Sequence, residues 1–137
     1  MTADVSVARP PLFVTPEDFR RLYTLAEDAT RRMPAVSGYL LDELERATQV
    51  PVDQLPPDAV TMGSRVTYRD DATGRERAVT LVFPGEENAD AAAVSILTPV
   101  GAALFGMRPG AVIDWQTPAG QNRTLTVLAV EPPRRGG

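Results

Sequence analysis

The fold of this chain is decided by residues 95–110, which read Ser95-Ile96-Leu97-Thr98-Pro99-Val100-Gly101-Ala102-Ala103-Leu104-Phe105-Gly106-Met107-Arg108-Pro109-Gly110. Thr98 is a natural helix cap, and Pro99 suits the first helical position, where its missing N–H leaves no helical hydrogen bond unmade. Gly106 can take the left-handed conformation that ends a helix, and Pro109-Gly110 favours a turn. The stretch therefore predicts a short strand, one compact helix over residues 100–105 and a turn into the next strand.

This predicted helix is too short to persist alone, and it is almost wholly apolar, so it must lie against a sheet. Apolar alternation and β-branched residues predict the strands of that sheet at residues 60–69 (with a kink at Gly63), 77–83, 94–97, 111–117 and 124–130. The expected fold class is α+β, with an antiparallel sheet curled around the single short helix.

The N-terminal half predicts two helices. Thr15-Pro16-Glu17-Asp18 is a strong helix start, because it offers a capping hydroxyl, a proline at the first position and acids near the positive end of the dipole. Apolar residues then recur at three- and four-residue steps, and Pro34 is expected to stop the helix near Arg32. A second amphipathic helix is predicted over residues 37–48. The short link makes the two helices an antiparallel hairpin.

The pattern divides the chain into five segments. We expect a flexible leader at 1–14, the short helical hairpin at 15–50, a proline-rich linker at 51–59, the sheet domain at 60–131 and a frayed tail at 132–137.

Composition excludes several kinds of chemistry. The 137 residues include no cysteine and no histidine, and all 14 basic residues are arginine. Thiolate nucleophiles, histidine bases and lysine Schiff bases are therefore ruled out, and we predict no enzymatic activity, no cofactor and no metal. The net charge of −4 argues against direct nucleic-acid binding. Without a membrane-spanning or secretory segment, a cytoplasmic location is expected. A monomer is the expected state, although no feature of the sequence determines it.

Three runs carry a resemblance to a known family. They are residues 60–66, residues 80–84, and residues 98–110 with their Thr-Pro-Val-Gly-Ala-Ala-Leu-Phe-Gly pattern. Over roughly residues 58–131 the chain resembles the C-terminal domain of the bacterial transcript-cleavage factors GreA and GreB. With its small helical hairpin it is still more similar to their short relatives of the Rnk family, the regulators of nucleoside diphosphate kinase.

The resemblance implies an FKBP-like C-terminal domain that docks on RNA polymerase at the rim of its secondary channel, in competition with the Gre factors. It also implies docking contacts from Leu97, Thr98, Pro99 and Val100, because Thr98-Pro99 corresponds to a Ser-Pro pair in Gre factors. Leu97 departs from the pattern, since some Gre factors carry an acid there. A plain helix entry is the alternative interpretation of Thr98-Pro99.

The predicted hairpin tip differs from that of a cleavage factor. Gre factors hold a catalytic Mg²⁺ with acids at the end of a long coiled coil, and such a site needs carboxylates. Here the tip carries Arg31 and Arg32, and the nearest acids, Glu27 and Asp28, are expected about a turn back. We therefore predict a polymerase-binding regulator that does not cleave transcripts. Arg31 and Arg32 are further candidate contacts, or simply solvated charges.

Other interpretations remain open. An FKBP-like domain suggests prolyl isomerisation in an aromatic-lined pocket, to which Trp115 and Tyr68 could contribute, although aromatics on strands are more often core residues. The family name allows direct control of nucleoside diphosphate kinase, but no phosphate-binding loop supports it. Glu86, Glu87 and Asp90 fit no Ca²⁺ loop and are expected to be a solvated acidic loop.

Overall fold

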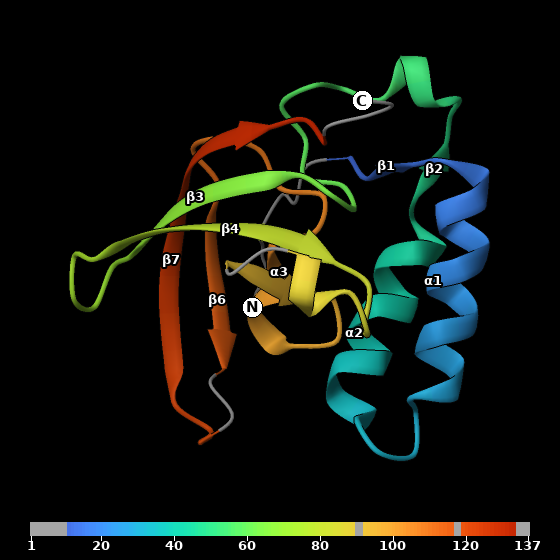
Figure 1. Cartoon of the computed structure of the whole chain (residues 1–137). Coiled ribbons are helices and arrows are strands. Elements are labelled where there is room, and N and C mark those ends of the chain that lie inside the picture. Colours follow the sequence, from blue (N-terminus) through green and yellow to red (C-terminus); the bar gives the residue numbers. More distant parts are fainter. Residues whose placement is uncertain (1–10, 90–91, 117–118, 134–137) are drawn as a thin grey trace, which may run out of the picture.

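A computed structural model describes residues 11–89, 92–116 and 119–133 (Figure 1). In chain order its helices and strands are β1 (Phe13–Val14), α1 (Pro16–Asp28), α2 (Pro34–Glu45), β2 (Thr48–Gln49), β3 (Arg65–Asp70), β4 (Glu76–Val82), β5 (Ala93–Ser95), α3 (Pro99–Leu104), β6 (Val112–Gln116) and β7 (Asn122–Glu131), with 3-10 turns at Val52–Gln54 and Glu87–Ala89. Among the described helices, none combines the length and the apolar character needed to cross a membrane.

The strands β3 to β7 form one five-stranded sheet in the order β5-β4-β3-β7-β6. Three of the four pairings are antiparallel, as predicted, but β5 runs parallel to β4, with Thr80 opposite Ala93. The prediction of an entirely antiparallel sheet is therefore wrong at this pair. The reason is the segment after β4, which brings the chain back alongside that strand before β5 begins, and such a crossover makes the neighbours parallel.

The predicted strand at residues 60–62 does not join the ladder. Instead, the Val60 N–H donates to the Met107 carbonyl at 2.8 Å, and the Gly106 N–H donates to the Val60 carbonyl at 2.9 Å. Val60 is fully buried. This segment therefore holds the exit of α3 against the body of the protein, and the regular strand begins only at Arg65.

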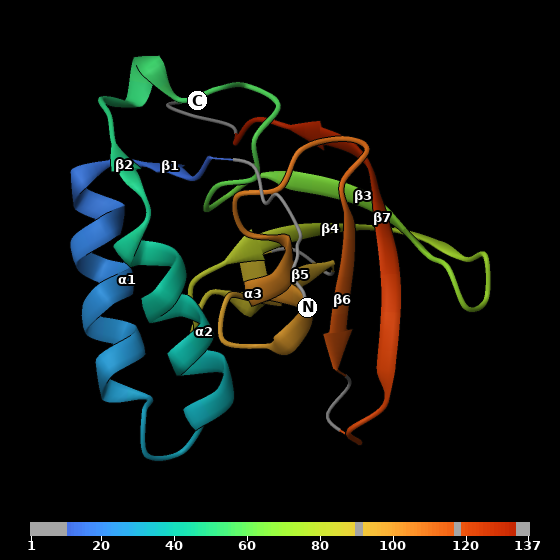
Figure 2. The same cartoon turned by 180° about the vertical axis from the view of Figure 1, so that it is seen from behind.

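The short helix α3 forms where it was predicted, one residue earlier at each end. The Thr98 hydroxyl accepts a hydrogen bond from the Gly101 N–H at 3.0 Å, and Pro99 occupies the first turn. Gly106 has a φ of +83°, the left-handed conformation that the helix end requires. Both views of the molecule place α3 between the sheet and α2 (Figures 1 and 2). Its last four residues are buried, so it forms the centre of the core.

The helical hairpin forms with a shifted link. Thr15 caps α1 by accepting from the Asp18 N–H at 3.2 Å, but α1 ends at Asp28 instead of near Arg32. Pro34 starts α2 instead of ending α1. A proline can do either, because its missing N–H is harmless in the first turn of the following helix. Residues 29–33 therefore make the turn at the tip.

A two-residue parallel pair, β1 with β2, closes the base of the hairpin and was not predicted. The Thr48 N–H donates to the Leu12 carbonyl at 2.8 Å, and the Val50 N–H donates to the Val14 carbonyl at 2.9 Å. Leu12 and Val14 are completely buried. The last residues of the expected leader thus belong to the folded body.

One hydrophobic core joins the hairpin to the sheet. Buried residues of the hairpin, such as Leu22 and Leu40, belong to the same cluster as Phe105 and Leu125. At its edge the Arg21 guanidinium lies 3.6 Å from the centre of the Phe83 ring and 3.3 Å from a Glu86 carboxylate oxygen. The hairpin therefore packs along the sheet domain, as Figure 1 shows.

Candidate functional site

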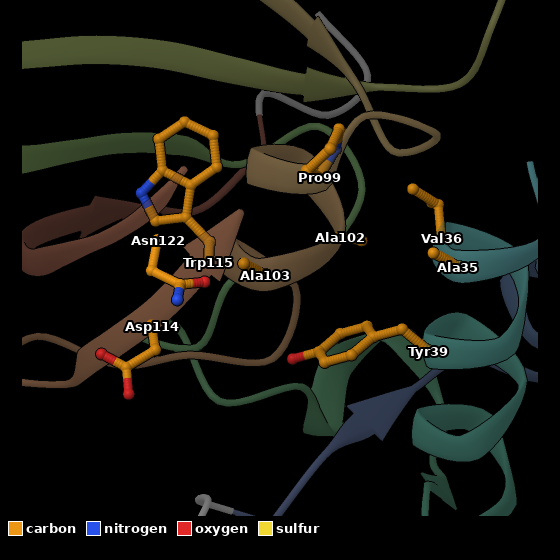
Figure 3. Close-up of a pocket in the computed structure, with 9 residues that line it drawn as sticks. All are labelled: Ala35, Val36, Tyr39, Pro99, Ala102, Ala103, Asp114, Trp115 and Asn122. Carbon is orange, nitrogen blue, oxygen red and sulfur yellow. The ribbon is translucent and has the colours of Figure 1, made fainter. Parts of the chain in front are cut away.

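A cleft of about 440 Å³ opens between the hairpin and the sheet, with α3 as its floor (Figure 3). It is lined by residues from four elements: Ala35, Val36, Tyr39, Pro99, Ala102, Ala103, Asp114, Trp115 and Asn122. Clefts of this size with mostly apolar walls are the usual binding sites of small ligands or of a few side chains.

Small residues on α3 create the hollow. Ala102 and Ala103 are nearly buried and reach only one carbon from the backbone. The opposing walls are larger: Figure 3 shows Tyr39 and Val36 entering from α2 and Trp115 on β6. The shape suits an apolar group that lies on the alanines between the two aromatic rings.

Polar groups gather at the sheet side of the cleft. Asp114 is exposed, and one of its carboxylate oxygens accepts a hydrogen bond from the Thr124 hydroxyl at 3.1 Å. Asn122 lies near it at the start of β7. Among the described residues that line the cleft, Asp114 is the charged one, so a ligand there meets a negative charge at one wall.

The predicted docking segment, residues 97–100, lies at the edge of the cleft where α3 begins. Pro99 lines the cleft and Val100 is half-buried beside it. Leu97 is only 8% exposed and packs in the core, so its side chain supports the segment from within. The Thr98 hydroxyl donates to the Ser95 carbonyl at 2.8 Å while it caps α3. The segment is consequently held in one conformation.

The structure brings the hairpin tip to the same side of the molecule as this segment. Arg31 and Arg32 are exposed in the tip turn, and Ala35, three residues after Arg32, already lines the cleft together with Pro99. Glu27 and Asp28 are the last two residues of α1. Because α1 ends earlier than predicted, these acids lie directly before the tip turn.

The other residues that the sequence offers as candidates fall into core residues, one cleft residue and surface acids. Tyr68 is 7% exposed and belongs to the core, whereas Trp115 is half-buried and lines the cleft. Glu86 pairs with Arg21 at the surface, as a solvated acidic loop would, and Asp90 lies outside the described residues. Across the described residues there is no group of three or more acidic side chains that could hold a metal ion.

Behind the cleft, α2 carries a buried acid. Glu43 is 5% exposed and accepts two hydrogen bonds from the Arg46 guanidinium, at 2.8 and 3.0 Å. The hydrogen bond to Glu43 raises the pKa of Arg46, against the opposing effect of its partial burial. The ion pair balances the charge of Glu43 where α2 packs against the core.

Comparison with known proteins agrees with this architecture. Residues 10–50 match the family described as Rnk N-terminus, and residues 55–132 match the family described as Transcription elongation factor, GreA/GreB, C-term. The chain is 35% identical over 125 residues to the Regulator of nucleoside diphosphate kinase of Escherichia coli (strain K12), covering 91% of this chain and 92% of that protein. This chain belongs to the Rnk family.

Among solved structures, the Rnk-family chain is similar to the "Prokaryotic transcription elongation factor GreA/GreB from Nitrosomonas europaea", with a TM-score of 0.73 and 33% identity. The match covers 90% of this chain and 99% of that one. It is also 37% identical to Transcription elongation factor GreA of Azorhizobium caulinodans, over 66% of this chain and 57% of the other. Through residues 55–132, this chain is thus similar to the GreA/GreB transcription elongation factors.

Proposed function

We propose that this protein is a transcription regulator that binds RNA polymerase near its secondary channel and does not cleave transcripts. The family relationship supports the partner, because the similar proteins are named transcription elongation factors. The single observation that carries the proposal is that the Pro99 segment and the hairpin tip lie on one side of the molecule. One surface of the polymerase can contact the Pro99 segment and the hairpin tip at once. In this proposal the protein acts in the cytoplasm as a monomer and does not bind nucleic acid directly.

The docking surface is the exposed part of Thr98, Pro99 and Val100 together with Arg31 and Arg32. The segment is fixed by the Thr98 hydrogen bonds and by Leu97 below it, so it presents a pre-formed surface. Pre-formed surfaces lose little entropy on binding. The two arginines add electrostatic attraction toward an acidic patch on the polymerase.

Co-elution with core RNA polymerase tests this surface. We expect the purified protein to elute with the polymerase and to be displaced by GreA or GreB. The double variant Arg31→Glu and Arg32→Glu should weaken the complex, whereas Arg75→Glu, on the exposed turn after β3, should leave it unchanged. Binding that survives excess GreA and GreB would refute a shared docking site.

The reach of the hairpin supports the absence of cleavage. At about 1.5 Å per residue, the 13 residues of α1 span roughly 20 Å. Its tip exposes Arg31, Arg32 and Met33, and holding a catalytic Mg²⁺ there would require carboxylates at the reacting centre. Glu27 and Asp28 are close to the tip, so length is the stronger of the two arguments.

Backtracked elongation complexes with Mg²⁺ test the chemistry. We expect no added RNA cleavage with this protein, with GreB as the positive control. The double variant Arg31→Asp and Arg32→Glu should also fail, because extra acids do not lengthen the hairpin. Cleavage by the unmodified protein would contradict the proposal, and cleavage by the acidic variant alone would show that charge, and not reach, is limiting.

Prolyl isomerisation is a second candidate, favoured by one observation: the cleft places Tyr39 and Trp115 on either side of a hollow. It predicts faster cis/trans exchange in a proline peptide without polymerase. The name of the Escherichia coli relative points to nucleoside diphosphate kinase. We infer that any such effect runs through transcription, so adding this protein to purified kinase should leave the kinase rate unchanged.

A further inference from the structure

Among the strands that the structure describes, β6 lies at one edge of the sheet. β6 is the last strand in the order β5-β4-β3-β7-β6 and has β7 as its one neighbour in the sheet. It is longer than the other edge strand, β5, which has three residues. An edge strand presents a row of N–H and C=O groups that another chain can pair with.

The register shows which groups of β6 face outward. The Val127 N–H donates to the Ala111 carbonyl at 2.9 Å and the Val127 carbonyl accepts from the Gly110 N–H at 2.8 Å, so both backbone groups of Val127 bond to the segment that enters β6. Because hydrogen-bonded positions alternate in antiparallel pairs, Val112, opposite Thr126, and Asp114, opposite Thr124, turn their backbone groups away from β7. Within the described residues, no other strand pairs with these groups.

The cleft lies directly beside this edge. Asp114 and Trp115 belong both to β6 and to the cleft wall, and the alanines of α3 form the floor next to them. An extended segment placed along β6 would point every second side chain toward α3. Those side chains would enter the hollow above Ala103, and the ones between would pass Asp114.

We propose that β6 and the cleft together bind an extended peptide segment of a partner protein as an added strand. The backbone of the segment pairs with Val112 and Asp114, its alternate apolar side chains fill the cleft, and a basic side chain faces Asp114. In this mode of recognition, main-chain hydrogen bonds provide affinity, and the cleft provides specificity for the side chains of the peptide. The inference goes beyond polymerase docking, because it assigns an extended peptide to the cleft and the strand edge beside it.

Trp115 allows a direct test, because it is the one tryptophan in the sequence and lines the cleft. The probe is an acetylated, amidated peptide of sequence Val-Arg-Val-Thr-Val-Arg, followed by tryptophan fluorescence and by the amide NMR signals of Val112 and Asp114. We expect saturable binding that shifts both amides. A copy of the peptide with N-methyl groups on alternate residues, which cannot pair along one edge, should bind about tenfold more weakly.

Two pairs of variants separate the edge from the cleft. Val112→Pro removes one outward N–H at an exposed edge position and should weaken binding about tenfold, while Val112→Thr keeps the N–H and should leave it nearly unchanged. Ala35→Trp fills the cleft mouth and should weaken binding similarly, while Gln54→Trp, on the exposed Val52–Gln54 turn, should not. Circular dichroism checks that each variant is folded.

Several results would contradict the proposal that a peptide adds as a strand to β6. Equal binding of the N-methylated peptide, or binding insensitive to both Val112→Pro and Ala35→Trp, would overturn the added-strand proposal. So would no fluorescence change at millimolar peptide, or a helical bound peptide. A dimer in sedimentation that Val112→Pro abolishes would assign the edge to a second copy instead. Co-elution of Val112→Pro with polymerase is measured separately, so a failure of this inference is distinguishable from a failure of polymerase docking.

Discussion

Leu12 packs directly on Gly106, so closely that a Cβ added to Gly106 would overlap the Leu12 Cδ1 atom. The contact joins the first residues of the described chain to the end of α3. Leu12 is fully buried, and its carbonyl also accepts the hydrogen bond that pairs β1 with β2. One side chain thus links the base of the hairpin, the central helix and the sheet domain.

Truncating this side chain should therefore be costly. We expect Leu12→Ala to lower the free energy of unfolding by about 2–5 kcal/mol, since a buried leucine is lost and a cavity remains. Urea denaturation followed by circular dichroism gives the value. The matched control is Val52→Ala, at an apolar residue that is 48% exposed, where the change should stay within about 0.5 kcal/mol.

A double-mutant cycle isolates the contact itself. Gly106→Ala should destabilise for two reasons: the φ of +83° strains any residue with a Cβ, and the new methyl group meets Leu12. In the Leu12→Ala background the second cost disappears. We expect a coupling of about 1–2 kcal/mol between the two positions, and additive costs would show that Leu12 is not the neighbour that matters.

Gly101 should tolerate no side chain at all. A Cβ there would overlap the Ser95 carbonyl oxygen, a backbone atom that cannot move without breaking the turn before α3. We expect Gly101→Ala to cost about 2 kcal/mol or more. Gly38 is the contrasting helical glycine, because a Cβ added there would meet no atom within 4 Å beyond its own stretch of helix, and Gly38→Ala should stabilise the protein by about 0.5–1 kcal/mol. Thermal unfolding of both variants compares them directly.

The Thr98 cap should depend on its hydroxyl. Thr98→Ala removes the acceptor for the Gly101 N–H and the donor to the Ser95 carbonyl, so it should cost about 1–2 kcal/mol. Thr98→Ser keeps both hydrogen bonds and should cost much less. A loss of the same size in both variants, measured by chemical denaturation, would mean that the methyl group and not the cap holds this turn.

Alkaline stability should depend on Tyr68. Burial raises the pKa of Tyr68 above its usual value of 10.0, against the lowering effect of nearby Arg77. The folded protein then holds the phenolic proton more tightly than the unfolded chain does. Stability contributed by this group is therefore complete below about pH 10 and is lost as the pH rises through the raised pKa. Tyr68→Phe should flatten the fall in unfolding free energy above about pH 10, while Tyr23→Phe, at an exposed tyrosine, should not.

Local sequence signals predict helix caps and helix ends correctly where a residue type favours a single backbone role. The Thr15 and Thr98 caps and the left-handed Gly106 are confirmed because each follows from the backbone chemistry of its own turn. The prediction for Pro34 is wrong because a proline can either end a helix or begin the next one, and Pro34 begins α2. The family relationship, carried by the same short motif, is confirmed as well.

The features that sequence reasoning missed depend on distant segments meeting. The β1–β2 pair has two residues on each strand, too few to show any periodicity. The parallel direction of β5 depends on the path of the chain after β4. The cleft combines Tyr39, Ala103 and Asp114, which share no local pattern, and among its lining residues the sequence indicates a pocket role for Trp115 alone.

The pairing of β1 with β2 also bears on how long the hairpin can be. The chain enters and leaves the two helices at neighbouring points, so every residue between Val14 and Thr48 is part of a loop whose ends are already fixed. The free-energy cost of closing such a loop, which comes from lost chain entropy, rises by only about 0.6 kcal/mol for each doubling of the loop length. Whole helical turns inserted at the tip, between Thr30 and Met33, would leave the pairing at the base unchanged, and the same base can therefore carry hairpins of different length.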